Sequence, residues 1–235
     1  MKDKKIFFKR IFMSLAGVIV LAIAVGILKT AALGVDPFTT TVIGLDKAIP
    51  LQYGIIYIIY NVVLLTFSLI FNRKLIGVAT FINLFLLGYI TQFTQFLLIK
   101  VNAEPAIWLR IIYFIVAIVI MCYGSALYIT ADLGVSTYDA IALTMANKWK
   151  WGKFKFIRII TDCCCLIIGT GLYLLAKGTW KEVFSFVGVG TIILAFFMGP
   201  LVDFFNVHCA EPMLYGKNDK STETVETTAE EAAKE

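Results

Sequence analysis

Apolar residues form six long runs along this chain, separated by short segments that carry glycine, proline and charged residues. The runs cover roughly residues 11–28, 53–71, 75–99, 107–129, 155–176 and 183–206. Each run is near the ~20 residues that an α-helix needs to cross the hydrocarbon core of a bilayer. The pattern therefore predicts an all-α membrane protein with six transmembrane helices.

The composition agrees with this prediction. Hydrophobic residues make up 60% of the chain and charged residues only 16%, with a mean hydropathy of +0.85, which excludes an ordinary soluble domain. The first run follows the basic segment MKDKKIFFKR, so a cleaved signal peptide is the alternative there. The run exceeds the ~7 to 15 residues of a signal-peptide core, and we therefore expect it to remain as the first span.

Two segments of the chain are nearly the same, TAALGVDPFTT at residues 30–40 and TADLGVSTYDA at residues 130–140. The similarity continues in the last run of each half, where Gly77, Thr80 and Gly88 match Gly188, Thr191 and Gly199. These matches predict two membrane repeats, at residues 11–99 and 107–206.

The repeated segment has the residues that end one helix and begin another. Gly34 and Gly134 suit a helix C-terminus, where a left-handed residue is favoured. Asp36, followed by a proline, is a good N-cap, and Ser136 with Asp139 three residues later approximates a capping box. About ten helical residues then follow, which is ~15 Å of helix or half a bilayer. The sequence thus predicts one short, broken or re-entrant helix in each half.

These short helices either turn back or cross the membrane. If they turn back, each half has three spans and the halves are inverted; if they cross, each half has four spans and the halves run parallel. The distribution of lysine and arginine between the loops does not decide. Asp36, Asp46, Lys47 and Pro50 leave no apolar run of ~18 residues in the first short helix, and this favours two pseudo-symmetric, inverted repeats.

The charged ends predict an orientation. Basic residues gather in residues 1–10 and in NKWKWGKFKFIR at residues 147–158, and positive segments are retained in the cytoplasm. The aromatic residues of the second cluster are typical of a collar at the lipid headgroups rather than of nucleic-acid binding. Residues 207–235 are acidic and poor in apolar residues, which predicts a disordered cytoplasmic tail.

Several polar residues fall where they are costly. Arg158 and Asp162 lie four residues apart on one face of the fifth run and can pair, and Asp139 lies at the start of the second short helix. A carboxylate at membrane depth pairs, titrates or binds something, whereas threonine, serine and glycine stripes are more typical of helix packing. The candidate substrate-binding residues are Asp36, Asn83, Ser136, Tyr138, Asp139, Arg158 and Asp162.

Motifs of enzymatic chemistry are missing from the sequence. It has no Walker A loop, HExxH or GxSxG, and its single histidine is His208, so we expect no enzyme, no catalytic residues and no cofactor. The five cysteines show no CxxC spacing, and we expect no metal site.

Inverted repeats with discontinuous helices are a common plan of secondary transporters, in which helix N-termini near the midplane face the substrate. We therefore expect a small-molecule secondary transporter or exporter, with the bilayer as its surroundings and an unknown small molecule as its substrate. The alternative is a non-transporting membrane component, either a substrate-capture subunit that needs a partner ATPase or an assembly factor. A chain of this size is also a candidate for homodimerisation.

The chain resembles a known family. The segments LGVDPFTTTVIGLDKAIPLQYG, NVVLLTFSLIFNRKLIGVATFINLFLLGYITQF and LGVSTYDAIAL together are similar to bacterial YitT/YczE-type membrane proteins, up to about residue 206. The resemblance implies a small multi-pass protein of the bacterial plasma membrane that is often considered a transporter or exporter, and it brings no agreed catalytic residues. Many members have an aromatic–acidic pair, found here as Tyr138 and Asp139 but replaced by Phe38 and Thr39 in the first half, which argues against a symmetric two-acid mechanism.

Overall fold

The structure is a computed structural model that describes residues 2–152 and 154–215. In chain order its helices are α1 (Lys2–Ala31), α2 (Pro37–Ala48), α3 (Tyr53–Phe71), α4 (Val78–Val101), α5 (Ile107–Thr130), α6 (Thr137–Leu143), α7 (Phe154–Leu175), α8 (Trp180–Phe186), α9 (Val189–Phe205) and α10 (Glu211–Tyr215). A 3₁₀ turn at Arg73–Leu75 precedes α4, and π-helical turns follow α6 and α9. The described part of the chain contains no β-strand.

The all-α membrane fold is confirmed. Among the described residues, six helical segments are long and apolar enough to cross a membrane: Ile6–Ala31, Tyr53–Phe71, Val78–Val101, Ile107–Thr130, Phe156–Leu175 and Trp180–Tyr215. They overlap the six apolar runs of the sequence. The two short helices α2 and α6 lie between spans in the two halves, as predicted.

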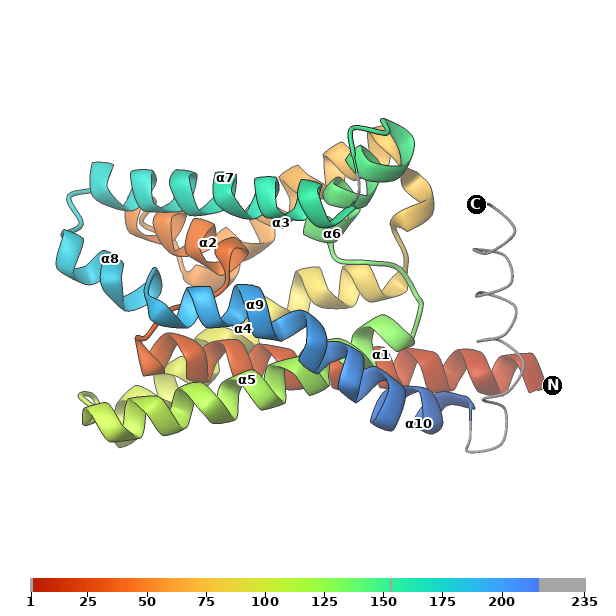
Figure 1. The fold of residues 1–235 in the computed structure, drawn as a ribbon, viewed down its shortest axis with the longest axis horizontal. Coiled ribbons are helices and arrows are strands. Elements are labelled where there is room, and N and C mark those ends of the chain that lie inside the picture. The colour runs from red at the N-terminus through yellow and green to blue at the C-terminus, as the bar shows by residue number, and fades with distance from the viewer. Residues whose placement is uncertain (1, 153, 216–235) are drawn as a thin grey trace.

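Helices α1 and α5 cross at two glycines and form the centre of the bundle. They run in opposite directions, α1 from the N-terminal end of the bundle and α5 towards it (Figure 1). A Cβ on Gly17 would lie 2.8 Å from the Gly124 carbonyl oxygen, so the two backbones touch in the way that small residues permit between membrane helices. Met13, Leu28 and Met121 are almost fully buried around this contact.

Helix α2 turns back rather than crossing the bundle. It begins near the middle of the molecule and runs to the end at which α1 stops (Figure 1), and Lys29 of α1 and Asp46 of α2 line one cavity there. In the second half, Lys148 follows α6 and donates a hydrogen bond to the Phe71 carbonyl, so α6 returns to the end where α3 stops. This course agrees with inverted halves, while the origin of the halves as repeats stays a prediction.

The breaks before α2 and α6 are alike in their backbone angles. Ala32 and Asp132 are left-handed, with φ of +51° and +48°, and Gly34 and Gly134 have φ of +130° and +109°. Each break therefore has two residues with positive φ, the predicted glycine and the residue two positions before it. The glycines are needed for a second reason, since a Cβ on Gly34 would lie 2.8 Å from Thr191 Oγ1.

The segment that follows α1 is held by the second half of the chain. The Val35 N–H donates to the Phe186 carbonyl at 2.9 Å, and the Gly190 N–H donates to the Leu33 carbonyl at 2.8 Å. Backbone groups at membrane depth have no water to bind and need such partners. The end of α8 and the start of α9 thus stabilise the break between α1 and α2.

The segment that follows α5 is held by the first half in the same way. The Val135 N–H donates to the Leu75 carbonyl and the Ala79 N–H donates to the Leu133 carbonyl, each at 3.0 Å. Thr80 adds a side-chain bond, since its hydroxyl donates to the Val135 carbonyl at 2.6 Å. Each half therefore supplies the partners for the break in the other half.

The C-terminal segment differs from the sequence prediction over residues 207–215. Instead of disorder, the chain continues from α9 through the π-helical turn Asn206–Ala210 into α10. Leu214 is buried, and Lys9 Nζ donates to its carbonyl at 3.0 Å, so α10 packs beside α1 at the N-terminal end of the bundle (Figure 1). The rest of the predicted tail, residues 216–235, lies outside the described residues.

The α1–α5 contact predicts opposite effects for two glycine-to-alanine changes. A Cβ on Gly124 would lie 2.7 Å from the Leu21 backbone nitrogen, whereas a Cβ on Gly171 in α7 meets nothing within 4 Å. We expect Gly124→Ala to lower the free energy of unfolding by about 1–3 kcal/mol through overpacking. Gly171→Ala should leave it unchanged or raise it by up to about 1 kcal/mol. Thermal unfolding in detergent measures both, and equal melting temperatures would contradict the close helix crossing.

Candidate functional site

The first turn of α6 is shaped by its N-cap. The Ser136 hydroxyl accepts a hydrogen bond from the Asp139 N–H at 3.1 Å and donates to Asp139 Oδ2 at 2.6 Å. The predicted capping box is therefore modified, because the Asp139 carboxylate binds the serine hydroxyl rather than the serine backbone. This geometry presents Tyr138 and Asp139 to the first turns of α7.

Arg158 of α7 joins two carboxylates and a tyrosine. Its guanidinium forms an ion pair with Asp139 Oδ1, and its Nε lies 3.3 Å from Asp162 Oδ1. The same guanidinium lies over the Tyr138 ring, 4.4 Å from the centroid, and the Tyr138 hydroxyl donates to Asp162 Oδ1 at 2.5 Å. Five of the predicted residues, Ser136, Tyr138, Asp139, Arg158 and Asp162, thus form one connected group, here called the ionic cluster.

The ionic cluster carries more negative than positive charge. One guanidinium faces two carboxylates, so its formal charge is −1 when both acids are ionised. The exposed fractions of the Arg158, Asp139 and Asp162 side chains are 33%, 36% and 26%. These groups are therefore accessible to a solute while still being partly desolvated, which strengthens their charge interactions relative to water.

Asp36 lies at the place of Ser136 in the first half and is likewise an N-cap, but it takes part in none of the ion pairs among the described residues. It caps α2, accepting from the Thr39 N–H at 2.9 Å and from the Thr39 hydroxyl at 2.6 Å. The next aromatic residue, Phe38, packs its ring 5.5 Å from that of Tyr138. The N-terminal turns of α2 and α6 therefore meet at this ring contact, beside the ionic cluster.

Asn83 belongs to a separate buried hydrogen-bond network. It accepts from the Tyr57 hydroxyl at 2.9 Å, and the Tyr57 ring lies 5.7 Å from that of Phe38. Asn61 extends the network, accepting from the Thr137 hydroxyl of α6 at 2.5 Å. Asn83 is thus linked to α6 through aromatic packing and through Tyr57 and Asn61, while among the described residues it forms no direct hydrogen bond with the ionic cluster.

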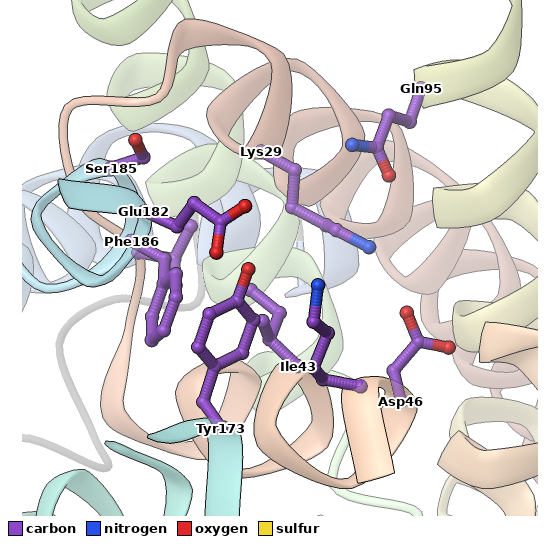
Figure 2. Close-up of a pocket in the computed structure, with 10 residues that line it drawn as sticks. Lys29, Ile43, Asp46, Gln95, Tyr173, Glu182, Ser185 and Phe186 are labelled. Atoms are coloured by element: carbon purple, nitrogen blue, oxygen red, sulfur yellow. The ribbon is translucent and has the colours of Figure 1, made fainter. Parts of the chain in front are cut away.

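A cavity of about 400 Å³ lies at the other ends of α2 and α7. Its lining comes from five helices, and Figure 2 shows polar side chains from several of them around it. The lining residues are Lys29, Val35, Ile43, Asp46, Lys47, Gln95, Tyr173, Glu182, Ser185 and Phe186. The sequence pattern does not indicate this site, because Lys29 and Glu182 flank the apolar runs and Asp46 and Lys47 indicate only that the first short helix is polar.

Aromatic rings hold the two lysines of the cavity. Lys29 Nζ lies 3.4 Å from the Tyr53 ring centroid and Lys47 Nζ lies 5.3 Å from that of Tyr173. Asp46, which lies outside the spans at the end of α2, has its pKa raised by burial, and the charge of Lys29 opposes this shift. Among the described residues, no group of three or more His, Cys, Asp or Glu side chains is placed to hold a metal ion.

The model of a protein family of unknown function, DUF6198, matches residues 8–207. The chain belongs to this family. Among relatives, an uncharacterized membrane protein of Bacillus subtilis, YczE, is 25% identical over 190 residues, covering 80% of this chain and 81% of YczE. A second B. subtilis protein, YyaS, is 22% identical over 80% of this chain and 88% of its own length. An uncharacterized protein of Haemophilus influenzae is 25% identical over 84% of each chain.

The comparisons confirm the YczE-type bacterial membrane family that the sequence motifs indicated. No solved structure matches this chain. The family assignment therefore identifies a multi-pass membrane protein and brings no substrate or catalytic residues with it.

The charge balance of the ionic cluster predicts that removal of Arg158 lowers the free energy of unfolding. Arg158→Met leaves two carboxylates without their cation, and we expect the free energy of unfolding to fall by about 1–3 kcal/mol. This is below the roughly 3–5 kcal/mol typical of breaking a fully buried pair, because about a third of the Arg158 side chain is exposed. The triple variant Arg158→Met, Asp139→Asn, Asp162→Asn should recover most of the loss.

Thermal unfolding of the three proteins measures this effect, with Arg73→Met as the matched control. Arg73 is exposed and its Nε donates only to the Leu69 carbonyl at 2.9 Å, so its loss should be close to neutral. A triple variant as unstable as Arg158→Met would mean that the arginine acts by packing and not by its charge.

Proposed function

We propose that the chain is a small-molecule secondary transporter or exporter of the bacterial plasma membrane, with both termini in the cytoplasm. The observation that carries the proposal is the meeting of the N-terminal turns of α2 and α6, two short helices that start inside the bundle, beside the charged ionic cluster. Discontinuous helices whose N-terminal turns meet at a charged centre are a recurrent feature of secondary transporters.

The arrangement of the halves supports alternating access. Helices α1 and α5 run in opposite directions across their glycine contact (Figure 1), so a tilt of one half against the other would open the centre to each side in turn. The two breaks are supported by the opposite half through four backbone hydrogen bonds. Because these supports lie in the opposite half, such a tilt would carry α2 with the second half and α6 with the first.

The ionic cluster has the chemistry for exchange with a solute. Arg158 contacts Asp139 and Asp162 through two of its nitrogens and has further N–H groups that can donate to an anionic group. The excess carboxylate among Asp139 and Asp162 would accept a cation or a proton. Two buried hydroxyls, those of Tyr53 and Tyr128, have no hydrogen-bond partner among the described residues. Water or a polar solute atom would satisfy them. In this role the protein binds and moves its solute without changing it chemically.

A partner-dependent membrane component is the second candidate. An apolar groove of about 610 Å³ runs between α5 and α9, and its lining includes Ile115, Val119, Ile193 and Phe197. Such a groove suits the apolar side chains of another membrane helix. This favours a capture subunit or assembly factor only if the purified chain fails to transport.

Transport is tested with the full chain in proteoliposomes. Metabolites, amphiphilic drugs and anions are first screened for stabilisation of the purified protein against heat, since a ligand that binds only the folded state raises the melting temperature. Flux of each stabilising compound is then followed in liposomes. We expect at least one compound to cross, and Asp162→Asn to reduce its flux by about tenfold or more because this change removes a charge from the cluster.

Asp203→Asn is the matched control, because Asp203 is exposed near the end of α9 and should support wild-type flux. Stabilising compounds that do not cross any proteoliposome membrane would contradict the transporter. Co-purification with a partner ATPase would then point to the capture subunit.

A further inference from the structure

The cavity at the ends of α1, α2 and α7 is lined by charged side chains of both signs that form no ion pair with each other. Lys29 and Lys47 supply two cations, and Asp46 and Glu182 supply two carboxylates, so the formal charge of the lining is zero. Within the described residues, the ion pairs shorter than 4.0 Å all lie elsewhere. The charges are therefore kept apart around a shared space.

The lysines are held by rings and not by acids. Lys29 Nζ lies over Tyr53 and Lys47 Nζ over Tyr173. A cation–π contact fixes an ammonium through the ring face and leaves N–H groups that can donate to another molecule. Both ammonium groups thus keep hydrogen-bonding capacity for a ligand.

The acidic and neutral polar groups also have unused capacity. Glu182 Oε2 accepts from a backbone N–H in the cap of α8 at 2.9 Å, and the Tyr173 hydroxyl is a further hydrogen-bond partner of this carboxylate. A carboxylate has about four acceptor sites, so capacity for a ligand remains. The side chains of Asp46, Gln95 and Ser185 form no hydrogen bond with another described residue. Figure 2 shows Lys29, Asp46 and Glu182 extending from three different helices towards the same space. Partly desolvated groups of this kind gain most from a ligand that supplies the missing partners.

The size and walls of the cavity limit the ligand. A volume of about 400 Å³ is near the lower end of the roughly 300–1,000 Å³ typical of small-molecule sites. Two carboxylates oppose the entry of a polyanion, and two lysines oppose a polycation. Ile43 and Phe186 add an apolar wall, against which a short side chain can pack.

We propose that this cavity binds a small zwitterion with the chemistry of an α-amino acid. Its carboxylate lies between Lys29 and Lys47, and its ammonium group faces Asp46 and Glu182. Binding of a zwitterion in this cavity does not require that the protein transports it. The cavity is also separate from the ionic cluster, which lies at the opposite ends of α2 and α7.

The test measures thermal stability of the purified full chain with the twenty standard L-amino acids, added one at a time. At least one should raise the melting temperature in a concentration-dependent way. Two derivatives of that amino acid then each lack one charge, namely the N-acetyl form and the α-carboxamide form. Both should lose about tenfold or more in affinity, because each leaves one pair of charged side chains without a partner.

Substitutions of single cavity residues test whether the amino acid binds in this cavity. Lys29→Met and Asp46→Asn should weaken binding by about tenfold or more, and Lys47→Met gives the same readout if Lys29→Met fails to fold. Lys100→Met is the control, since Lys100 Nζ lies over the Phe96 ring at 4.8 Å in the same type of contact but outside the cavity.

The outcomes separate this inference from the transport proposal. Stabilisation by no amino acid, equal stabilisation by a singly charged derivative, or binding that survives both cavity variants would overturn the zwitterion site. Such a result leaves the transporter standing if another compound crosses the proteoliposome membrane. Amino-acid binding that depends on Lys29, with no flux of any compound, would support the site and contradict transport.

Discussion

The rest of the structure depends on how the chain satisfies two backbone breaks inside a membrane. Each break leaves N–H and C=O groups without helical partners, and the hydrocarbon offers none. The partners come from the other half of the chain. Val35 and Leu33 bond to the last residue of α8 and the start of α9, and Val135 and Leu133 bond to the 3₁₀ turn before α4 and the start of α4. Neither half can form its short helix at this depth without the other, so we infer that the two halves fold as one unit.

This mutual support explains where the polar chemistry lies. With the breaks fixed near the middle, α2 and α6 start inside the bundle and return to opposite ends of it (Figure 1). α2 packs along α7, where the Thr41 hydroxyl donates to the Cys165 carbonyl at 3.0 Å. That pair of helices has the ionic cluster beside its inner end and the charged cavity at its outer end. The two charged sites thus lie at the two ends of one closely packed pair of helices, in which a Cβ on Gly44 would overlap the Gly169 carbonyl oxygen.

The sequence predicted the parts of the fold that local chemistry decides. The spans follow from apolar length, the Asp36 cap of α2 from an aspartate before a proline, and the Arg158–Asp162 contact from a spacing of four on one helix. Contacts between distant segments could not be predicted in this way. The bridge from Arg158 to Asp139 and the pairing of each break with the opposite half depend on helix packing. The cavity was missed because its four charged residues lie at the ends of three helices that are far apart in the sequence. The helical end at residues 207–215 was missed because Leu214 is stabilised by contact with α1.

The central claim is that α2 and α6 turn back inside the bundle. Its most direct test is the side of the membrane from which single cysteines react with an impermeant thiol reagent, in a background without Cys122, Cys163, Cys164, Cys165 and Cys209. The account predicts that cysteines at Leu51 and Ala103 react from one side and cysteines at Lys74 and Trp151 from the other. If Leu51, Ala103 and Trp151 shared one side and Lys74 lay alone on the other, both short helices would cross the membrane, and the inverted arrangement would be wrong.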